Sequence, residues 1–180
     1  MQYRRARVEG GTYFFTVVTF ERRRILCEGE NAAVLREAFR TVIRRHPFVI
    51  DAIAVLPDHL HCVWSLPADD RDFSTRWRLI KSCFSRECEP RGADRFVCSR
   101  AKTKETTVWQ RRYWEHLIRD ERDFAAHCDY IHYNPVKHGL VAAPKDWPHT
   151  SFHRCVRVGL YDANWGAGEE VVLGEGVGRE

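Results

Sequence analysis

Two strand-like runs separated by a very short turn constrain the fold of this chain more than any other feature. Residues 48–56 are apolar and rich in β-branched side chains, and a second such run occupies residues 60–66. Pro57-Asp58 between them has the composition of a tight turn. Strands joined by so short a turn must be antiparallel neighbours, because parallel strands need a long crossover. We therefore predict a β-hairpin whose second strand starts at His59.

His59 and His61 are predicted to lie side by side on one face of that second strand. Side chains two residues apart in a strand point the same way, so both imidazoles share a face. Leu60, Cys62 and Trp64 alternate with them and can anchor the other face in a core. A pair of neighbouring imidazoles suits a metal ion. The pair alone also allows a structural role, in which one histidine caps the turn and the other packs as a polar-tipped ring.

The predicted elements around the hairpin give a β-α-β-β-α-β order. They are a first strand at residues 13–20, an amphipathic helix at 31–46, a second amphipathic helix at 74–88, and a fourth strand within 108–118. Residues 90–106 have no apolar periodicity and are predicted to form a mobile basic loop. This order is that of an α+β, ferredoxin-like split βαβ fold, an antiparallel sheet with helices mainly on one face. The helix that follows the fourth strand is expected beside the strand that carries the two histidines. The two histidines are then expected on the open face of the sheet.

A third helix is predicted to begin at Asp120, because an acidic first turn follows a capping residue. Its inward stripe at helical spacing consists of Phe124, Cys128 and Ile131. Tyr130 and Asn134 lie together on one flank of that stripe, with Cβ atoms about 5–6 Å apart. A phenol and an amide oxygen so placed can address one ion or one phosphate. An amphipathic surface tyrosine is the structural alternative.

Three neighbouring residues bear on this site prediction. His127 lies within helical reach of Tyr130, and a structural or solvent-facing role is favoured over catalysis. Tyr133 is the weaker candidate for a nucleophile, because it lies about half a turn from the stripe. Pro135 is expected to disturb or end the helix, since the residue before a proline avoids the α conformation. Asn134 would then lie at a helix end, where its amide can lean toward a metal ion.

Length and composition favour one cytoplasmic domain. The chain has 180 residues, and its seven cysteines show no paired spacing that indicates a disulfide framework or a zinc ribbon. No apolar run approaches the length of a membrane span, and residues 1–7 lack the apolar core of a signal peptide. We predict a single domain over residues 1–165, followed by a disordered Gly/Glu-rich tail at residues 166–180.

Basic residues gather in clusters, although the formal net charge is only +4 and the sequence pI is about 8.7. Arginine outnumbers lysine, and its planar fork suits phosphate oxygens, so a polyanionic partner is predicted. Solvated surface charge is the alternative for any single cluster. The candidates for contact with nucleic acid are Arg4, Arg5, Arg7, Lys81, Arg111 and Arg112.

Three blocks in one order resemble the signature motifs of the REP-associated tyrosine transposases. The blocks are Leu56-Pro57-Asp58-His59-Leu60-His61, then Trp109 to His116, then Tyr130 to Val141, which contains Tyr130-Ile131-His132-Tyr133-Asn134-Pro135. These proteins belong to the single-tyrosine transposases within the HUH endonuclease superfamily. The opening Tyr3-Arg4-Arg5 and the closing Trp147-Pro148-His149 follow the same family order, so the resemblance extends to about Trp165.

The resemblance implies a metal-dependent endonuclease and strand transferase that acts on single-stranded DNA through a 5′-phosphotyrosine intermediate. At the matching positions, His59, His61 and Asn134 would be the metal ligands, and Tyr130 would be the nucleophile. The ion would be Mg²⁺ or Mn²⁺, with Mn²⁺ bound more tightly by imidazole. The implied substrate is single-stranded or hairpin DNA from palindromic repeats. The protein would act as a monomer or a homodimer.

Two other functions fit parts of the same sequence. A sequence-specific DNA-hairpin-binding protein without turnover would use the same sheet, but it would not need intact His59, His61, Tyr130 and Asn134. A replication initiator or relaxase more often has a longer chain, and no helicase phosphate loop is present here. Insertion-sequence enzymes often have Gln at the position of Asn134, so the shorter amide favours the REP-associated branch.

Overall fold

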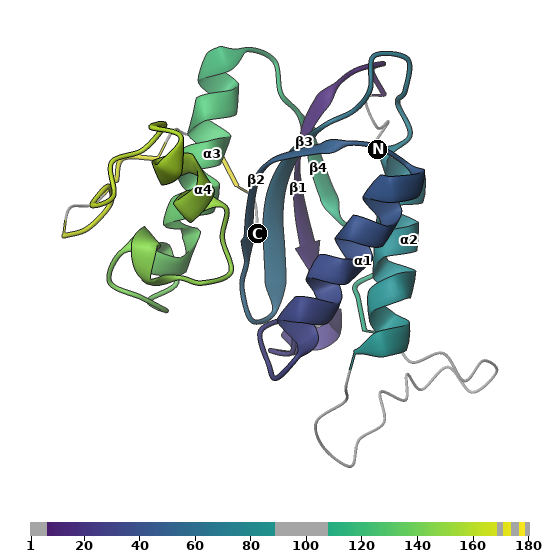
Figure 1. Ribbon diagram of the computed structural model, residues 1–180, viewed down its shortest axis with the longest axis horizontal. Helices are drawn as coiled ribbons and strands as arrows, with labels where there is room; N and C mark the ends of the chain where they lie inside the picture. Colours follow the sequence, from purple (N-terminus) through teal and green to yellow (C-terminus); the bar gives the residue numbers. More distant parts are fainter. Residues whose placement is uncertain (1–6, 89–107, 169–170, 174–176, 179–180) are drawn as a thin grey trace.

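A four-stranded antiparallel sheet forms the centre of the molecule (Figure 1). The computed structural model describes residues 7–88, 108–168, 171–173 and 177–178. The strands are β1 (Thr12–Val18), β2 (Val49–Val55), β3 (His59–Ser65) and β4 (Trp114–Leu117), in the spatial order β2-β3-β1-β4. All three strand pairings are antiparallel. The prediction of a ferredoxin-like α+β fold is confirmed, and the predicted loop at 90–106 lies outside the described residues.

The β2–β3 hairpin forms where the sequence predicts it. Val55 pairs with Leu60, and the Leu56 N–H donates to the His59 carbonyl at 2.8 Å across the Pro57-Asp58 turn. β3 lies between β2 and β1, so its backbone is paired on both sides. A slip of one residue would move both histidines to the opposite face, so this central position specifies their orientation.

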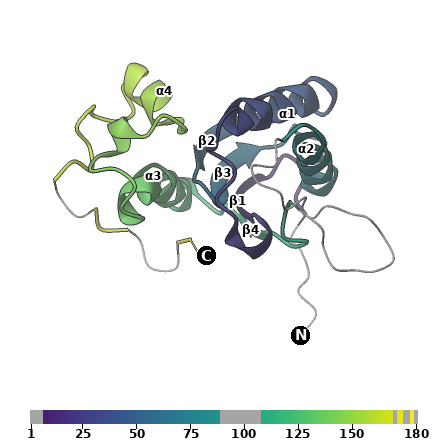
Figure 2. The same ribbon diagram turned by 90° about the horizontal axis from the view of Figure 1, so that it is seen from below.

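The helices α1 (Asn31–Arg45) and α2 (Phe73–Glu87) cover one face of the sheet (Figure 2). Leu60, Cys62 and Trp64 of β3 point into this layer and are fully buried, as the alternation along the strand predicts. Trp64 stacks on Trp77 of α2 with ring centroids 4.5 Å apart. The main hydrophobic core therefore anchors β3 from the side opposite to its histidines.

The helix α3 (Glu121–Lys137) lies on the other face, against β2 and β3 (Figure 2). The expectation that His59 and His61 look out from an open face was therefore wrong, because both are almost completely buried, with 1% and 0% exposed. The apolar stripe of α3 covers small and apolar residues of the sheet, which removes both surfaces from water. This second core consists of Phe14, Ala52, Ala54, Leu56, Val63, Cys128, Tyr130 and Ile131.

α3 begins after the predicted cap Asp120, but it does not end before Pro135 as expected. It continues to Lys137, and the chain turns back at Gly139, which has a positive φ of 65°. Pro135 is buried in the last turn, and its nitrogen cannot make the hydrogen bond of a regular helix. The helix ends two residues after this proline. Asn134 therefore lies in the last turn of the helix, at a helix end as expected.

The remaining described segments are short. β4 is shorter than the predicted 108–118, and Trp109 forms only an isolated bridge to Thr19. Three short helical turns complete the described chain: η1 (Phe20–Arg22), η2 (Pro144–Asp146) and α4 (Phe152–Arg157). Within the described part of the chain, no helix has both the length and the apolar composition needed to cross a membrane.

Candidate active site

β3 presents His59 and His61 on the face that α3 covers. The register between β3 and β1 places Thr16 opposite His61, and Thr16 Oγ1 is hydrogen-bonded to His61 Nδ1 at 2.9 Å. His59 Nδ1 is hydrogen-bonded to Asp58 Oδ1 at 2.7 Å. The two imidazole centroids are 4.9 Å apart, and the rings are nearly perpendicular at 80°. Both rings are thus held through Nδ1, and Nε2 is the atom that a metal ion would bind.

Asp58 remains ionised beside His59. Burial by itself raises the pKa of Asp58, but the hydrogen bond and charge of His59, together with Arg22, outweigh burial and lower that pKa. Arg22 Nη1 lies 3.4 Å from Asp58 Oδ2. An ionised carboxylate accepts the Nδ1–H of His59, which places the lone pair of this imidazole on Nε2.

α3 brings Tyr130 directly to the histidine pair. The Tyr130 ring meets His61 edge to face, with centroids 5.1 Å apart and an interplanar angle of 74°. Phe14 of β1 contacts the same ring at a centroid distance of 6.0 Å. The side chain of Tyr130 is only 1% exposed, so packing on several sides fixes the orientation of the phenol.

Asn134 lies on α3 between two residues that contact the histidine pair. Tyr130, one turn before it, contacts His61, and His138, one turn after it, contacts His59 at a ring-centroid distance of 5.1 Å. Residues four apart share a helix face, so Asn134 faces the same two imidazoles. It is completely buried. The structure therefore brings Tyr130 to the histidine pair and places Asn134 one turn further along the same helix face.

Two residues next to this site were missed by the sequence prediction, namely His138 and Lys137. Lys137 Nζ donates a hydrogen bond of 3.5 Å to Tyr130 Oη, and it lies 4.8 Å from the centroid of that ring. His138 is four residues after Asn134, and Lys137 is seven residues after Tyr130. These spacings were the available signal, because residues so spaced share a helix face. The expected helix end at Pro135 concealed it.

Tyr133 lies away from the histidine pair. Its ring contacts Trp165 at a centroid distance of 6.3 Å, near the backbone of Gly166. Tyr133 therefore packs toward the segment that follows α4, and Tyr130 is the tyrosine of α3 that contacts His61.

Part of the segment at residues 166–180, predicted as a tail, packs beside the site. Leu173 and Val177 are partly buried against the core beneath α3. A side chain at Gly178 would overlap the ring of Tyr130, so the backbone approaches that ring as only glycine allows. Described residues of this segment thus cover one side of the Tyr130 ring.

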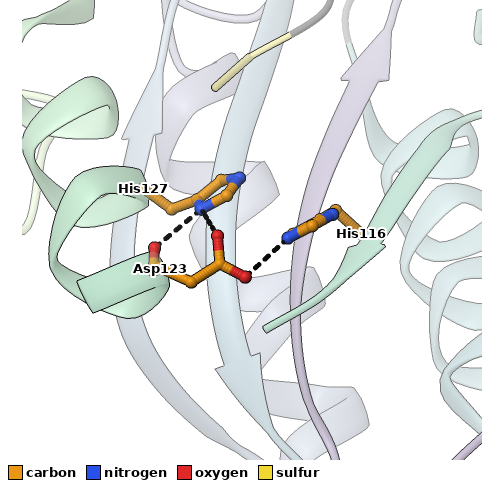
Figure 3. Close-up of side chains that lie close together, drawn as sticks. All are labelled: His116, Asp123 and His127. Atoms are coloured by element: carbon orange, nitrogen blue, oxygen red, sulfur yellow. Dashed lines mark hydrogen bonds and ion pairs between the residues drawn. The ribbon is translucent and has the colours of Figure 1, made fainter. Parts of the chain in front are cut away.

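A cluster of His116, Asp123 and His127 ties β4 to the first turns of α3 (Figure 3). Asp123 Oδ2 accepts a hydrogen bond from His116 Nε2 at 2.8 Å, and Asp123 Oδ1 lies 3.1 Å from His127 Nδ1. Arg119 adds its Nε and its backbone N–H at 3.1 and 3.0 Å. Burial raises the pKa of Asp123, but these donors outweigh burial and lower it to about 2. Asp123 is therefore a carboxylate at neutral pH.

The same cluster has the residue types of a metal site, and its ligand atoms lie within 4.8 Å of one another. Its ring geometry does not suit one ion. His116 and His127 are stacked, with centroids 4.7 Å apart and planes only 18° apart. A metal ion lies close to the plane of each imidazole that binds it, and two stacked, nearly parallel rings have no such common point. We therefore interpret the cluster as a hydrogen-bonded clamp that fixes α3 against β4.

One candidate DNA-binding residue, Lys81 of α2, reaches the segment before β4 that carries two others, Arg111 and Arg112. Lys81 Nζ donates to the Gln110 carbonyl at 3.0 Å and lies 5.3 Å from the centroid of the Tyr113 ring. Arg111 and Arg112 follow in the same segment, and both are exposed. The structure thus groups the positive charges of Lys81, Arg111 and Arg112 near one another.

The remaining basic candidates come from the start of the chain. Arg7 Nη2 donates to Ser74 Oγ at 3.3 Å, at the first turn of α2. Tyr113 Oη donates to the same hydroxyl at 3.4 Å, so Arg7 lies beside the segment that holds Arg111 and Arg112. Arg4 and Arg5 lie outside the described residues.

Comparison with known proteins defines the class of enzyme. Residues 8–134 match the family described as IS200-like transposases, and the match contains both histidines, Tyr130 and Asn134. The match spans well over half of the chain, so this protein belongs to that transposase family, whose members are DNA nicking and joining enzymes.

Within that family the chain groups with the REP-associated tyrosine transposases. One from Escherichia coli (strain K12) is 43% identical over 178 residues, which cover 95% of this chain and 98% of the relative. A Haemophilus influenzae protein with the same family designation is 43% identical over 172 residues, covering 95% of this chain and 96% of the relative. A solved REP-associated tyrosine transposase bound to a REP hairpin is 42% identical, with a TM-score of 0.78, and the match covers 96% of this chain and 99% of that one.

Proposed function

We propose that this protein cleaves and rejoins single-stranded DNA beside a hairpin formed by a palindromic repeat. In this proposal Tyr130 is the nucleophile, and His59, His61 and Asn134 hold a divalent ion. The contact of Tyr130 with His61, with Asn134 one turn further along the same helix face, carries the proposal. The substrate class is supported by the hairpin-bound relative, because the two chains match almost end to end.

The donors around the histidine pair fit a divalent metal ion. Asp58 and Thr16 hold the two imidazoles through Nδ1, which is the usual support of metal-binding histidines. Three protein ligands, namely two nitrogens and one amide oxygen, leave coordination positions for a phosphate. Nitrogen donors favour Mn²⁺ over Mg²⁺ in affinity, although Mg²⁺ is also compatible. A divalent ion at this place would make the scissile phosphorus more electrophilic.

The proposed reaction at Tyr130 conserves the phosphodiester bond. Tyr130 Oη attacks phosphorus, so that a bond from Oη to phosphorus forms while the bond from phosphorus to the 3′ oxygen breaks. The phenol proton passes to solvent, and the released 3′ oxygen takes up a proton. A 3′ hydroxyl of another strand can then attack the phosphotyrosine in the reverse sense. Joining therefore needs no external energy source.

The packing around Tyr130 suits a group that must attack in line. His61 and Phe14 meet the ring from different sides, and the ring is buried. A phenol held in one orientation does not have to lose rotational freedom when the phosphate arrives, and this lowers the barrier of the chemical step.

The basic residues beside α2 are proposed to hold the hairpin stem. Lys81 belongs to α2, on the face of the sheet opposite to α3, and it contacts the segment that carries Arg111 and Arg112 just before the edge strand β4. A stem along α2 would require its single-stranded extension to pass around β4 to reach the phenol. One chain contains both surfaces, and light scattering of the protein with bound hairpin distinguishes a monomer from a homodimer.

The test of this proposal is the substitution Tyr130→Phe. The variant lacks the attacking oxygen, so no covalent protein–DNA adduct should form with a hairpin oligonucleotide and Mn²⁺. Hairpin affinity should stay within about twofold, because the ring and its packing remain. The adduct is detected by denaturing gel and the affinity by fluorescence anisotropy. Tyr133→Phe is the matched control and should form the adduct at the wild-type rate.

An adduct formed by Tyr130→Phe would disprove the assignment of the nucleophile. Specific hairpin binding by the wild-type protein, with no adduct in Mn²⁺ or Mg²⁺, would instead support the alternative function of a hairpin-binding protein without turnover.

A further inference from the structure

The ammonium group of Lys137 lies beside the phenol oxygen of Tyr130, the proposed nucleophile. Its Nζ lies 3.5 Å from Tyr130 Oη and 4.8 Å from the ring centroid. Both residues belong to α3 and are seven residues apart, a distance of about 10 Å along the helix axis. The two side chains therefore lean toward each other across two turns.

A lysine in the last turn of a helix has an ordinary explanation, because a cation there interacts favourably with the helix dipole. That interaction would hold the ammonium group near the C-terminal carbonyls or in water. In this structure the side chain of Lys137 instead runs back toward the N-terminus of α3 and ends at Tyr130 Oη. The side chains of a helix generally point toward its N-terminus, but neither this preference nor the dipole explains why the ammonium group meets the oxygen and the ring of Tyr130.

We infer that Lys137 is a further catalytic residue, whose ammonium group stabilises the negative charge that develops on Tyr130 Oη and on the attacked phosphate. This inference rests on the proposed role of Tyr130. In cleavage, Oη loses its proton to solvent while it forms the bond to phosphorus, and the 3′ oxygen departs and is protonated by solvent. Lys137 keeps its proton throughout and acts through charge and hydrogen bonding.

The position of Lys137 beside the tyrosyl oxygen predicts a kinetic signature. The same oxygen is the nucleophile in cleavage and the leaving group in rejoining, so the ammonium group should accelerate both directions equally. Removal of the charge should therefore lower both rates and leave the cleavage equilibrium unchanged. A lysine that only held the DNA in the ground state would instead weaken hairpin affinity and leave the rate at saturating DNA unchanged.

The experiment uses the full-length protein, a hairpin oligonucleotide with its single-stranded extension, and Mn²⁺. Adduct formation is measured in single turnover at saturating DNA, and rejoining is measured from isolated adduct with a 3′-hydroxyl strand. Lys137→Met should lower both rates about 10²-fold, a loss typical of removing one charge-stabilising donor. Lys137→Arg should recover much of the loss. Lys145→Met, which alters an exposed lysine bonded to Asn164, is the matched control and should retain wild-type rates.

A substrate with sulfur in place of the bridging 3′ oxygen tests whether Lys137 acts on the tyrosyl oxygen or on the 3′ leaving group. Its thiolate leaves easily, so it would rescue a variant that had lost assistance to the 3′ leaving group. Because Lys137 contacts the tyrosyl oxygen, this substrate should not rescue Lys137→Met.

The outcomes separate this inference from the proposed function. Rates within about twofold of wild type for a folded Lys137→Met would overturn the role of Lys137 alone. The same conclusion would follow if the sulfur substrate rescued the variant, or if weakened hairpin affinity accounted for the entire loss. The absence of an adduct from the wild-type protein would overturn the role of Tyr130, and the role of Lys137 with it.

Discussion

At the scale of single residues, the site depends on partners that lie far apart in the sequence. Strand alternation alone places His59 and His61 on one face, and the neighbouring Asp58 holds His59. Thr16, which holds His61, is 45 positions earlier in the chain. No local pattern connects those two residues, because their contact depends on the pairing register between β1 and β3.

Thr16→Val tests the support of His61. Valine has nearly the same shape as threonine, so the packing of the buried side chain is retained while the hydrogen bond to His61 Nδ1 is lost. We expect affinity for Mn²⁺ to fall about 10- to 100-fold, as is typical when a partner of a metal-binding histidine is removed. Free Mn²⁺ is measured by electron paramagnetic resonance during titration of the protein.

Thr16→Ser is the matched control for this prediction, because it keeps the hydroxyl group and should keep most of the Mn²⁺ affinity. Equal affinity of the valine and serine variants would show that the hydroxyl does not support a metal ligand. Hairpin affinity measured without metal should be the same for both.

At the scale of elements, α3 decides whether the site exists. The helix carries Tyr130, Asn134 and Lys137, and it must lie at the correct height over β3 for all of them. The clamp at Asp123 joins its first turns to β4 through His116 and to the preceding turn through Arg119. Strand β3 is anchored separately by the core on its other face. The two halves of the site are therefore positioned by different sets of contacts.

Asp123→Asn should lower stability through the clamp. The pKa of Asp123 is about 2 in the folded protein, against about 3.9 for an unperturbed aspartate. The ionised carboxylate therefore contributes about 2 kcal/mol above about pH 4, and this contribution is lost as the pH falls toward 2. We expect the variant to be less stable by about that amount at pH 7, with the difference shrinking below about pH 4.

Urea unfolding of the wild-type protein and the variant at pH 7 and at pH 3 measures this effect. Glu121→Gln removes a charge from an exposed residue in the same turn of α3, so it is the control for the general effect of charge near a helix start. A constant difference between the wild-type protein and Asp123→Asn at all pH values would contradict the prediction.

At the scale of the whole molecule, the sheet separates two surfaces. Helix α3 and the proposed chemistry occupy one face, while α1 and α2 occupy the other (Figure 2). Lys81 of α2 contacts the segment that carries the exposed Arg111 and Arg112. This separation predicts that charge removal beside α2 weakens DNA binding without altering the chemical step.

The double substitution Arg111→Ala/Arg112→Ala tests this division. Each lost phosphate contact should reduce the slope of log K against log salt by about 0.7 to 0.9, so the pair should reduce it by up to about 1.8. Hairpin affinity should fall, while the rate of adduct formation at saturating DNA stays near that of the wild-type protein. Fluorescence anisotropy over a salt series and single-turnover gels measure the two quantities.

The charge-matched control is Lys145→Ala/Arg157→Ala, which removes two positive charges near α4 and should leave the salt slope unchanged. A change in slope as large as that of the arginine pair would show that DNA responds to net charge rather than to a defined surface.

Local sequence patterns were sufficient to predict the order of the elements, the hairpin, and the faces on which neighbouring residues lie. Hydrophobic periodicity and turn composition are properties of neighbouring residues, so strand alternation at 59–61 and the flank of Tyr130 and Asn134 on α3 could be predicted. The burial of both histidines beneath α3, the continuation of α3 through Pro135, and the contact of Lys137 with Tyr130 follow from the packing of distant segments and could not be predicted locally. The free energy gained when α3 buries its apolar side chains against the sheet outweighs the conformational preferences of single residues such as Pro135. That gain depends on residues that are remote from each other in the chain.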